Sequence, residues 1–310
     1  MNLEPSENTS IYGYRYFFSE ITELYNNRKM PNKILLSGKK GSGKATFAYH
    51  LVNFFLSKNE EFKYNLTENK INPENKSFKL LQSSSHPNFY LIDLLAEKKN
   101  IDVAQIRGMI SYTNKSTFNN QDRFIMIDNV EYLNKNSINA LLKIIEEPNE
   151  NIYFILINNS EKNMLPTLKS RCITFKIHFS FDEIVNICNQ ILNQNILNKL
   201  NHDLINYYCT PGEIIKLVQF AEEKQINLKD HDVSSIISLI IENTYYKKNI
   251  FIKNLLINFI ELFLLKRYKT SNNKNFLLNF YQSFIQKINN TEKFNLDEES
   301  LFLEFKSKIL

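Results

Sequence analysis

The sequence predicts an α/β domain, with a parallel sheet covered by helices on both faces, followed by domains made of helices alone. In the first half of the 310 residues, apolar runs such as 123–128 (RFIMID) and 152–158 (IYFILIN) alternate with segments of helical periodicity. Uninterrupted apolar strands are typical of parallel sheets, which are buried on both faces. After about Phe179 the strand signals stop, and helical patterns dominate residues 181–310.

The elements of the first half follow one another along the chain. Residues 34–36 predict a strand that runs into a glycine-rich loop. The helix after that loop has an apolar face formed by Phe47, Ala48, Leu51, Val52 and Phe55. Residues 59–85 are polar and rich in Asn and Lys, which predicts a loop or a poorly ordered insertion. Further strands are predicted at residues 89–95, 123–128 and 152–158, and helices at 103–113 and 136–147, the last ended by Pro148.

The helical half has a polar break over residues 227–232. We therefore predict three domains: an α/β nucleotide-binding-type domain over 1–178, a small helical domain over 179–228 and a helical C-terminal domain over 229–310. A last helix is predicted to begin at Asn295, a capping residue with Glu298 three positions later.

The composition is that of a soluble globular protein, with 43% hydrophobic and 23% charged residues. A net charge of +5 is compatible with a nucleic-acid partner, but charge spread without a long Lys/Arg block is usual for a solvated surface. The apolar stretch 251–268 is interrupted by Lys253, Glu261 and Lys266, so it predicts an amphipathic core helix and no membrane span. The residues MNLEPSENTS lack the apolar core of a secretory signal, and we expect a cytoplasmic protein.

The three cysteines, Cys172, Cys188 and Cys209, are scattered along the chain. They match neither a disulfide framework nor the CxxC spacing of a zinc site. We expect reduced thiols and no metal site.

The first chemical motif is GKKGSGK at residues 38–44, which satisfies the GxxxxGK pattern between a strand and a helix. In such a loop, glycines let backbone N–H groups curl around phosphate oxygens, and the lysine supplies a positive charge at a helix N-terminus. An incidental Gly/Lys turn is the alternative, and the flanking strand and helix argue against it. The predicted nucleotide-binding residues of this segment are Gly38, Gly41, Ser42, Gly43, Lys44 and Thr46.

Two positions lack groups that hydrolysis needs. A Ser or Thr hydroxyl after the lysine normally ligates Mg²⁺, but this chain has Ala45, and Thr46 is turned by about 100° around the helix. Asp128 ends an apolar strand where an acid would meet Mg²⁺, but the next residue is Asn129, whose amide cannot act as a general base. We do not expect Glu131, beyond the strand, to replace the missing acid. The sequence therefore predicts phosphate binding without metal-assisted hydrolysis.

Two longer motifs resemble those of a known family. Residues 139–148 (NALLKIIEEP) resemble the NALLKxLEEP signature, and residues 164–172 (MLPTLKSRC) resemble the LPTxxSRC motif, of bacterial DNA polymerase III clamp-loader subunits of the AAA+ class. Residues 43–50 (GKATFAYH) and 83–89 (SSSHPNF) are similar to delta-prime subunits of the type that lacks a zinc module. The resemblance covers about residues 11–215.

The resemblance implies roles for further residues. Arg171 would be an arginine finger directed at the nucleotide of an adjacent subunit; the alternative is a surface or core-edge ion pair. Asn158 or Asn159 would be the sensor 1 residue that faces a phosphate, although an Asn at a strand end can equally satisfy backbone groups. Near residues 208–213 (YCTPGE), ATPase relatives carry an arginine, whereas here no Arg or Lys occurs before Lys216.

These features predict an ATPase-defective, delta-prime-like subunit of the DNA polymerase III holoenzyme. The resemblance implies that 179–228 is a lid and 229–310 an oligomerisation collar. It also implies partners: motor (tau/gamma) and delta subunits and, through the assembly, the sliding clamp and primed DNA. ATP or ADP would bind weakly without hydrolysis, and no zinc is expected because the four cysteines of the usual zinc module are missing. The alternative is an active, tau/gamma-like motor subunit, which Lys44 and Asp128 keep open. An unrelated P-loop kinase would not explain both longer motifs.

Overall fold

The computed structural model describes residues 4–95, 98–115, 121–147, 151–205, 209–294 and 296–309. The chain divides into two compact units, one formed by Met1–Ile191 with Thr210–Gly212 and the other by Leu192–Cys209 with Glu213–Leu310. The division into three domains stays a prediction.

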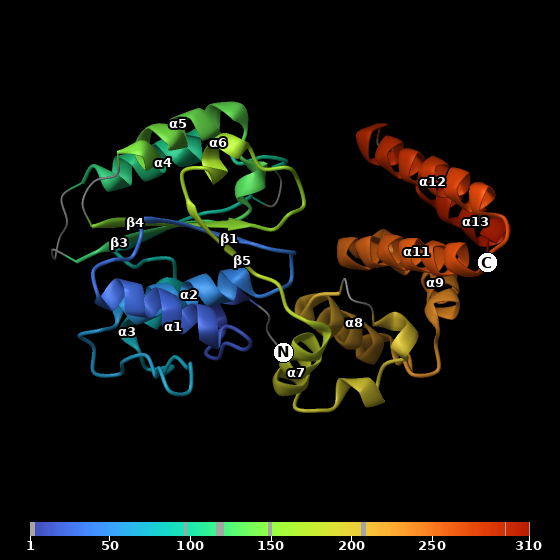
Figure 1. Ribbon diagram of the computed structural model, residues 1–310, viewed down its shortest axis with the longest axis horizontal. Helices are drawn as coiled ribbons and strands as arrows, with labels where there is room; N and C mark the ends of the chain where they lie inside the picture. The colour runs from blue at the N-terminus through green and yellow to red at the C-terminus, as the bar shows by residue number, and fades with distance from the viewer. Residues whose placement is uncertain are drawn as a thin grey trace. The chain divides into compact units, whose positions relative to one another are not determined.

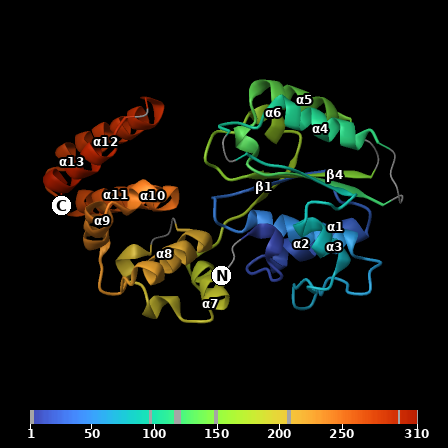
Figure 2. The ribbon, with the colours of Figure 1, turned by 180° about the vertical axis from the view of Figure 1, so that it is seen from behind.

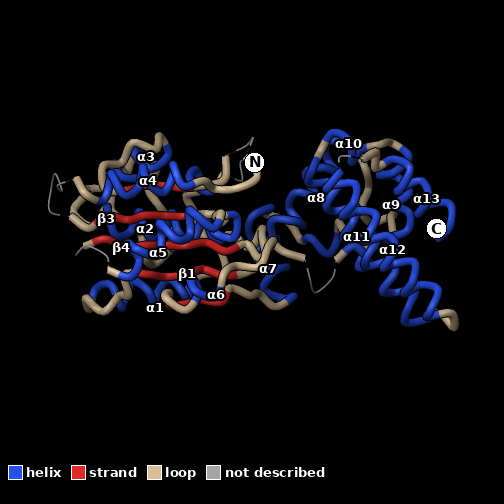
Figure 3. The backbone as a smooth tube through the Cα atoms, turned by 90° about the horizontal axis from the view of Figure 1, so that it is seen from above, coloured by secondary structure: helices blue, strands red, loops and turns tan. Residues whose placement is uncertain are grey.

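The first unit is built on a five-stranded sheet, as far as the described residues go, and every strand pair in it is parallel. The strand order is β2-β3-β4-β1-β5, and Figure 3 shows β3, β4 and β1 running side by side. The strands are β1 (Lys33–Ser37), β2 (Phe89–Ile92), β3 (Arg123–Ile127), β4 (Ile152–Asn158) and β5 (Ile173–Lys176). Parallel strands end at a common edge, which here gathers the residues after β1, β3 and β4.

Helices cover both faces of this sheet (Figures 1 and 2). On one face lie α1 (Arg15–Asn26), α2 (Lys44–Leu56) and α3 (Lys76–Gln82), and on the other lie α4 (Val103–Thr113), α5 (Lys135–Glu146) and α6 (Pro166–Lys169). Successive side chains of β3 point to opposite faces of the sheet, so this strand contacts both layers of helices. Phe124 stacks on Phe55 of α2 at a centroid distance of 5.0 Å, whereas Ile125 belongs to the buried cluster that includes Leu141 of α5. The predicted α/β fold class is confirmed.

Two expectations need correction, and one strand was missed. The segment 59–85 is not simply a loop, because it contains α3, which Asn75 caps by accepting a hydrogen bond from the Phe78 N–H. Phe78 and Leu81 bury the apolar side of this short helix. Strand β5 was not predicted. The last helix, α13 (Glu299–Ile309), begins later than expected, and its proposed cap Asn295 lies outside the described residues.

The rest of the chain is helical in its described parts, as predicted. Helix α7 (Phe181–Leu192) is followed by α8 (Pro211–Lys224), α9 (Val233–Glu242), α10 (Tyr245–Lys248), α11 (Ile250–Thr270), α12 (Lys274–Phe294) and α13. Short 3₁₀ turns lie at Pro5–Glu7, Val130–Tyr132, Ile196–Asn198 and His202–Leu204. The core of the second unit includes Ile236 and Ile240 of α9, Ile260 of α11 and Phe305 of α13, all fully buried.

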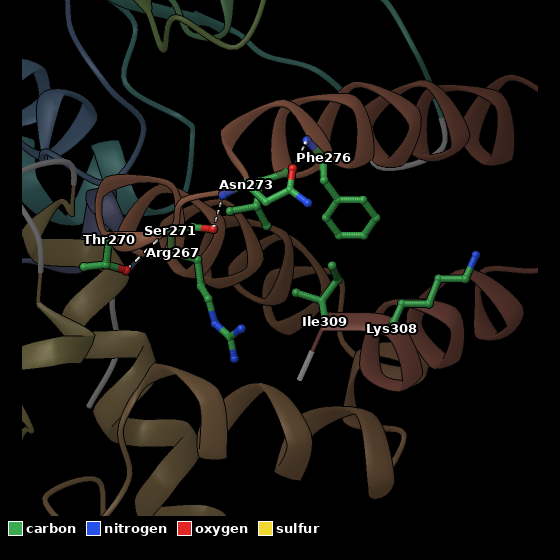
Figure 4. A pocket seen from close by; sticks show the side chains of 8 residues that line it. Arg267, Thr270, Ser271, Asn273, Phe276, Lys308 and Ile309 are labelled. Carbon is green, nitrogen blue, oxygen red and sulfur yellow. Dashed lines mark hydrogen bonds between the residues drawn. The ribbon is translucent and has the colours of Figure 1, made fainter.

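The second unit contains a cavity of about 430 Å³ where α11, α12 and α13 meet (Figure 4). Its lining includes Arg267, Thr270, Asn273, Phe276 and Lys308. The Asn273 side chain begins α12 by accepting a hydrogen bond from the Phe276 N–H. No helix of the described chain combines the length and the apolar character that crossing a membrane requires.

Candidate functional site

The glycine-rich loop lies between β1 and α2, at the carboxyl edge of the sheet. Gly41 and Gly43 have φ of 84° and 86°, a backbone region that favours glycine. Helix α2 begins directly at Lys44, so its first N–H groups have no intrahelical partner. The loop therefore has the backbone shape of a phosphate cradle, as the motif predicts.

The Lys44 ammonium group is folded back onto its own loop. It donates hydrogen bonds to the carbonyl oxygens of Gly38 at 2.8 Å and Lys39 at 2.7 Å, and it lies 3.3 Å from the Ser42 hydroxyl. The Lys44 side chain is buried. Burial lowers its pKa to about 8, although the nearby carboxylates, Asp128 first, act in the opposite direction. A phosphate would have to draw this ammonium away from the loop carbonyls.

Two further contacts fix the loop within the first unit. The buried Tyr14 hydroxyl donates to the Ser42 carbonyl oxygen at 2.9 Å. The Gly212 N–H donates to the Gly41 carbonyl oxygen at 2.9 Å. A Cβ added at Gly212 would lie 2.8 Å from that oxygen, so the two backbones approach as closely as glycines permit.

Asp128, at the end of β3, is enclosed in an amide network. Its Oδ1 accepts hydrogen bonds from the Asn129 N–H at 2.7 Å and from the Asn159 side chain at 3.1 Å. The Asn159 amide also donates to Asn129 Oδ1, and the Asn129 amide donates to Asp93 Oδ1 at 2.7 Å. Burial and the charge of Asp93 raise the pKa of Asp128 to about 6. Asp93 was missed, although it follows β2 just as Asp128 follows β3.

Glu131 takes part in the hydrogen-bond network at this edge of the sheet, although it lies beyond the end of β3. Asn129 adopts a left-handed conformation with φ of 55°, and the 3₁₀ turn after it buries Glu131. Glu131 Oε1 accepts the N–H groups of Asn159 at 2.9 Å and Glu161 at 3.3 Å. Its Oε2 is buried and has no hydrogen-bond partner among the described residues. Glu131 thus supports the loop that carries Asn159.

The two candidate sensor residues have different surroundings. Asn158 donates to the Ser37 hydroxyl at 3.2 Å and accepts the N–H of Ser160, so it satisfies neighbouring groups at the strand end. Asn159 is the one that reaches the carboxylate of Asp128.

The site has few groups that could bind a metal ion. Ala45 carries no oxygen, and Thr46 lies next to it on α2, half-buried. Across the described ranges, no group of three or more His, Cys, Asp or Glu side chains is arranged to hold a metal ion. The cradle fits a phosphate, whereas the usual hydroxyl ligand of Mg²⁺ is missing.

Arg171 lies just beyond α6, close to the end of α5. Its Nε donates to Glu146 Oε1 at 2.8 Å, its Nη2 lies 2.6 Å from the same oxygen, and its Nη1 donates to the Thr167 carbonyl oxygen at 2.9 Å. The Arg171 side chain is 38% exposed. An arginine in this setting can form an ion pair and still reach outward.

The segment in which ATPase relatives carry an arginine is only partly described, because Tyr208 lies outside the described residues. Lys216, the first cation after it, has its ammonium 5.4 Å from the centre of the Phe251 ring in the second unit.

The sequence is similar to known proteins over much of its length. A model of the family described as "DNA polymerase III, delta subunit" matches residues 15–180, which is more than half of the chain. A DNA polymerase III subunit delta' of Pseudomonas aeruginosa is 31% identical over 100 residues, covering 32% of this chain and 30% of its own. The subunit delta' of Bacillus subtilis is 26% identical over 220 residues, covering 68% and 62%. A DNA polymerase III subunit gamma of Buchnera aphidicola is 28% identical over 237 residues, covering 73% and 62%.

In each of these matches the chain spans less than two thirds of the relative's length. Among solved structures, a gamma-subunit-related protein of Thermotoga maritima covers 84% of this chain and 76% of its own, at 18% identity and a TM-score of 0.41.

Proposed function

This chain belongs to the DNA polymerase III delta-subunit family, and from that membership we propose that it is a delta-prime-type clamp-loader subunit that does not hydrolyse ATP itself. In this role it would assist motor and delta subunits in loading the sliding clamp on primed DNA, in the cytoplasm. The delta-prime relatives and the motifs at residues 139–148 and 164–172 support this choice.

One observation carries the proposal. The carboxylate of Asp128, which would meet Mg²⁺, accepts hydrogen bonds from amide groups, whereas a hydrolytic site needs a bound metal ion and a general base at this place. Asn129 and Asn159 both donate to Asp128 Oδ1, and Asn129 stands where a water-activating acid is needed. Ala45 removes the hydroxyl that would complete the metal site. Phosphate binding through Lys44 remains compatible with this arrangement, so we propose weak ATP or ADP binding without hydrolysis.

Arg171 is proposed to act on the nucleotide of an adjacent subunit. An arginine is always charged, and its planar fork matches phosphate oxygens. Its partial exposure leaves it accessible to a second chain.

The proposal is tested by reconstitution with motor subunits, delta subunit, sliding clamp and primed DNA. We expect Arg171→Ala to lower clamp loading by about tenfold or more, because arginine fingers supplied in trans contribute about 10³ to 10⁵ in rate. Arg107→Ala, which removes an exposed arginine of α4, is the matched control. Normal loading with Arg171→Ala would refute the finger role.

A second candidate is an active motor subunit of the same assembly. It is favoured by the presence of Lys44 and Asp128 and by the match to a gamma subunit over 73% of this chain. Turnover by the isolated chain separates the two. Sustained Mg²⁺-dependent ATP hydrolysis that Lys44→Ala abolishes would favour the motor.

A further inference from the structure

We propose that Glu146 is a positioning residue for Arg171, holding the guanidinium so that its outer end is ready to fork onto phosphate oxygens presented by a second chain. This inference rests on the proposed finger role of Arg171. Glu146 is the last residue of α5, within the NALLKIIEEP motif.

The donors of the guanidinium group support this orientation. Arginine has five N–H donors in a rigid plane. The edge formed by Nε and Nη2 faces Glu146 Oε1, and one Nη1 hydrogen points to the Thr167 carbonyl oxygen. Nη1 and Nη2 each carry one further N–H, for which the described residues provide no hydrogen-bond partner. Two such N–H groups of one guanidinium can bind two anionic oxygens.

The separation of the two residues is fixed by the core. Leu168 of α6 and Ile145 of α5 are buried members of one hydrophobic cluster, with exposures of 1% and 0%. Each lies within three residues of Arg171 or Glu146. The Arg171 backbone is tied to the same turn, because its N–H donates to the Leu168 carbonyl oxygen. The acid and the arginine are therefore held together by packing as well as by their charges.

Helix stability alone does not account for an acid at this position. A carboxylate in the last turn meets the negative end of the helix dipole, which disfavours it. Arg171 supplies the compensating charge. Glu147, the next residue, is also exposed and acidic but has no recorded contact with Arg171, which makes it a matched control.

The expected effect is modest. The side chains of the pair are 38% and 49% exposed, and ion pairs at such exposure change an equilibrium by a factor of up to about five. We expect Glu146→Ala to lower kcat of ATP hydrolysis by the reconstituted assembly about two- to fivefold, with KM unchanged. Glu147→Ala should leave both constants unchanged.

Three results decide the matter. In an Arg171→Ala background, Glu146→Ala should cause no further loss, and an undiminished loss there would overturn the inference by showing a merely structural role. In the isolated chain, the NMR signal of the Arg171 Nε–H should shift in Glu146→Ala and stay in place in Glu147→Ala. An unchanged signal in Glu146→Ala overturns the inference and leaves the proposed function standing. If Arg171→Ala alone has no effect on hydrolysis or loading, the proposed finger role fails, and this inference with it.

Discussion

Replacing Asp128 by Asn should stabilise the folded chain at neutral pH. The pKa of Asp128 rises from 3.8 to about 6 on folding, because burial and Asp93 disfavour its charge. This difference corresponds to a cost of about 3 kcal/mol at pH 7.5, where the carboxylate is ionised in both states. An Asn keeps the oxygen that the Asn129 N–H and the Asn159 amide bind. Because Lys44 loses some charge compensation, we expect a net gain of about 1 to 3 kcal/mol.

The sign of the pH dependence follows from the raised pKa. Between pH 4 and 6 the folded state holds a proton on Asp128 that the unfolded state has released, so this group's contribution to wild-type stability falls as pH rises through that range. The advantage of Asp128→Asn should therefore be full at pH 7.5 and almost absent at pH 4.

The assay is urea unfolding at both pH values, followed by circular dichroism. Hydrogen exchange of the β3 amides should accompany it, so that the transition of the first unit is identified. Glu61→Gln, at an exposed acid, serves as the control and should change stability by less than about 0.5 kcal/mol. If Asp128→Asn is destabilising at pH 7.5, or if its effect is independent of pH, then burial and Asp93 do not disfavour the charge of Asp128 in the folded state.

Three further predictions concern the glycine-rich loop. Gly212→Ala should lower the free energy of unfolding by about 1 to 2 kcal/mol, measured by thermal unfolding, because its Cβ would lie 2.8 Å from the Gly41 oxygen; an unchanged Tm would contradict the close contact. Ala45→Ser should strengthen ATP binding about tenfold only when Mg²⁺ is present, without sustained hydrolysis because Asn129 remains; calorimetry with and without Mg²⁺ checks this. ATP affinity should fall about tenfold between pH 7 and 9, since a pKa of about 8 means that Lys44 loses its charge over that range; a flat profile would show that the ammonium does not bind the phosphates.

The strands β3 and β4 were predictable because each is a continuous apolar run in the centre of the sheet. Strand β5 was not, because it is short and lies at the sheet edge, where Ile173 is exposed and no burial pattern marks it. Helix α3 was not predicted either. Its seven residues stand among polar neighbours, and their helical state depends on burying Phe78 and Leu81.

The glycine-rich loop at residues 38–44 and the replacement of two catalytic residue types, at Ala45 and Asn129, were predictable from the sequence, because each depends on residue type at a fixed spacing. The hydrogen-bond network around Asp128 was not predictable from the sequence. Whether Asn158 or Asn159 reaches that carboxylate is decided by the turn after β4, in which Ser160 has φ of 58°. The burial of Glu131 likewise depends on the left-handed conformation of Asn129.

The buried ring of Tyr14 has a practical consequence. It stacks on Phe47 at 4.5 Å, and one of its ring carbons lies 3.6 Å from where a Cβ at Gly43 would be. The chain has no tryptophan. An indole introduced at position 14 by Tyr14→Trp would be the sole strong emitter in the protein, packed against the glycine-rich loop. Its fluorescence would report any rearrangement of the loop when phosphate or a nucleotide is added, without a dye and without any dependence on turnover.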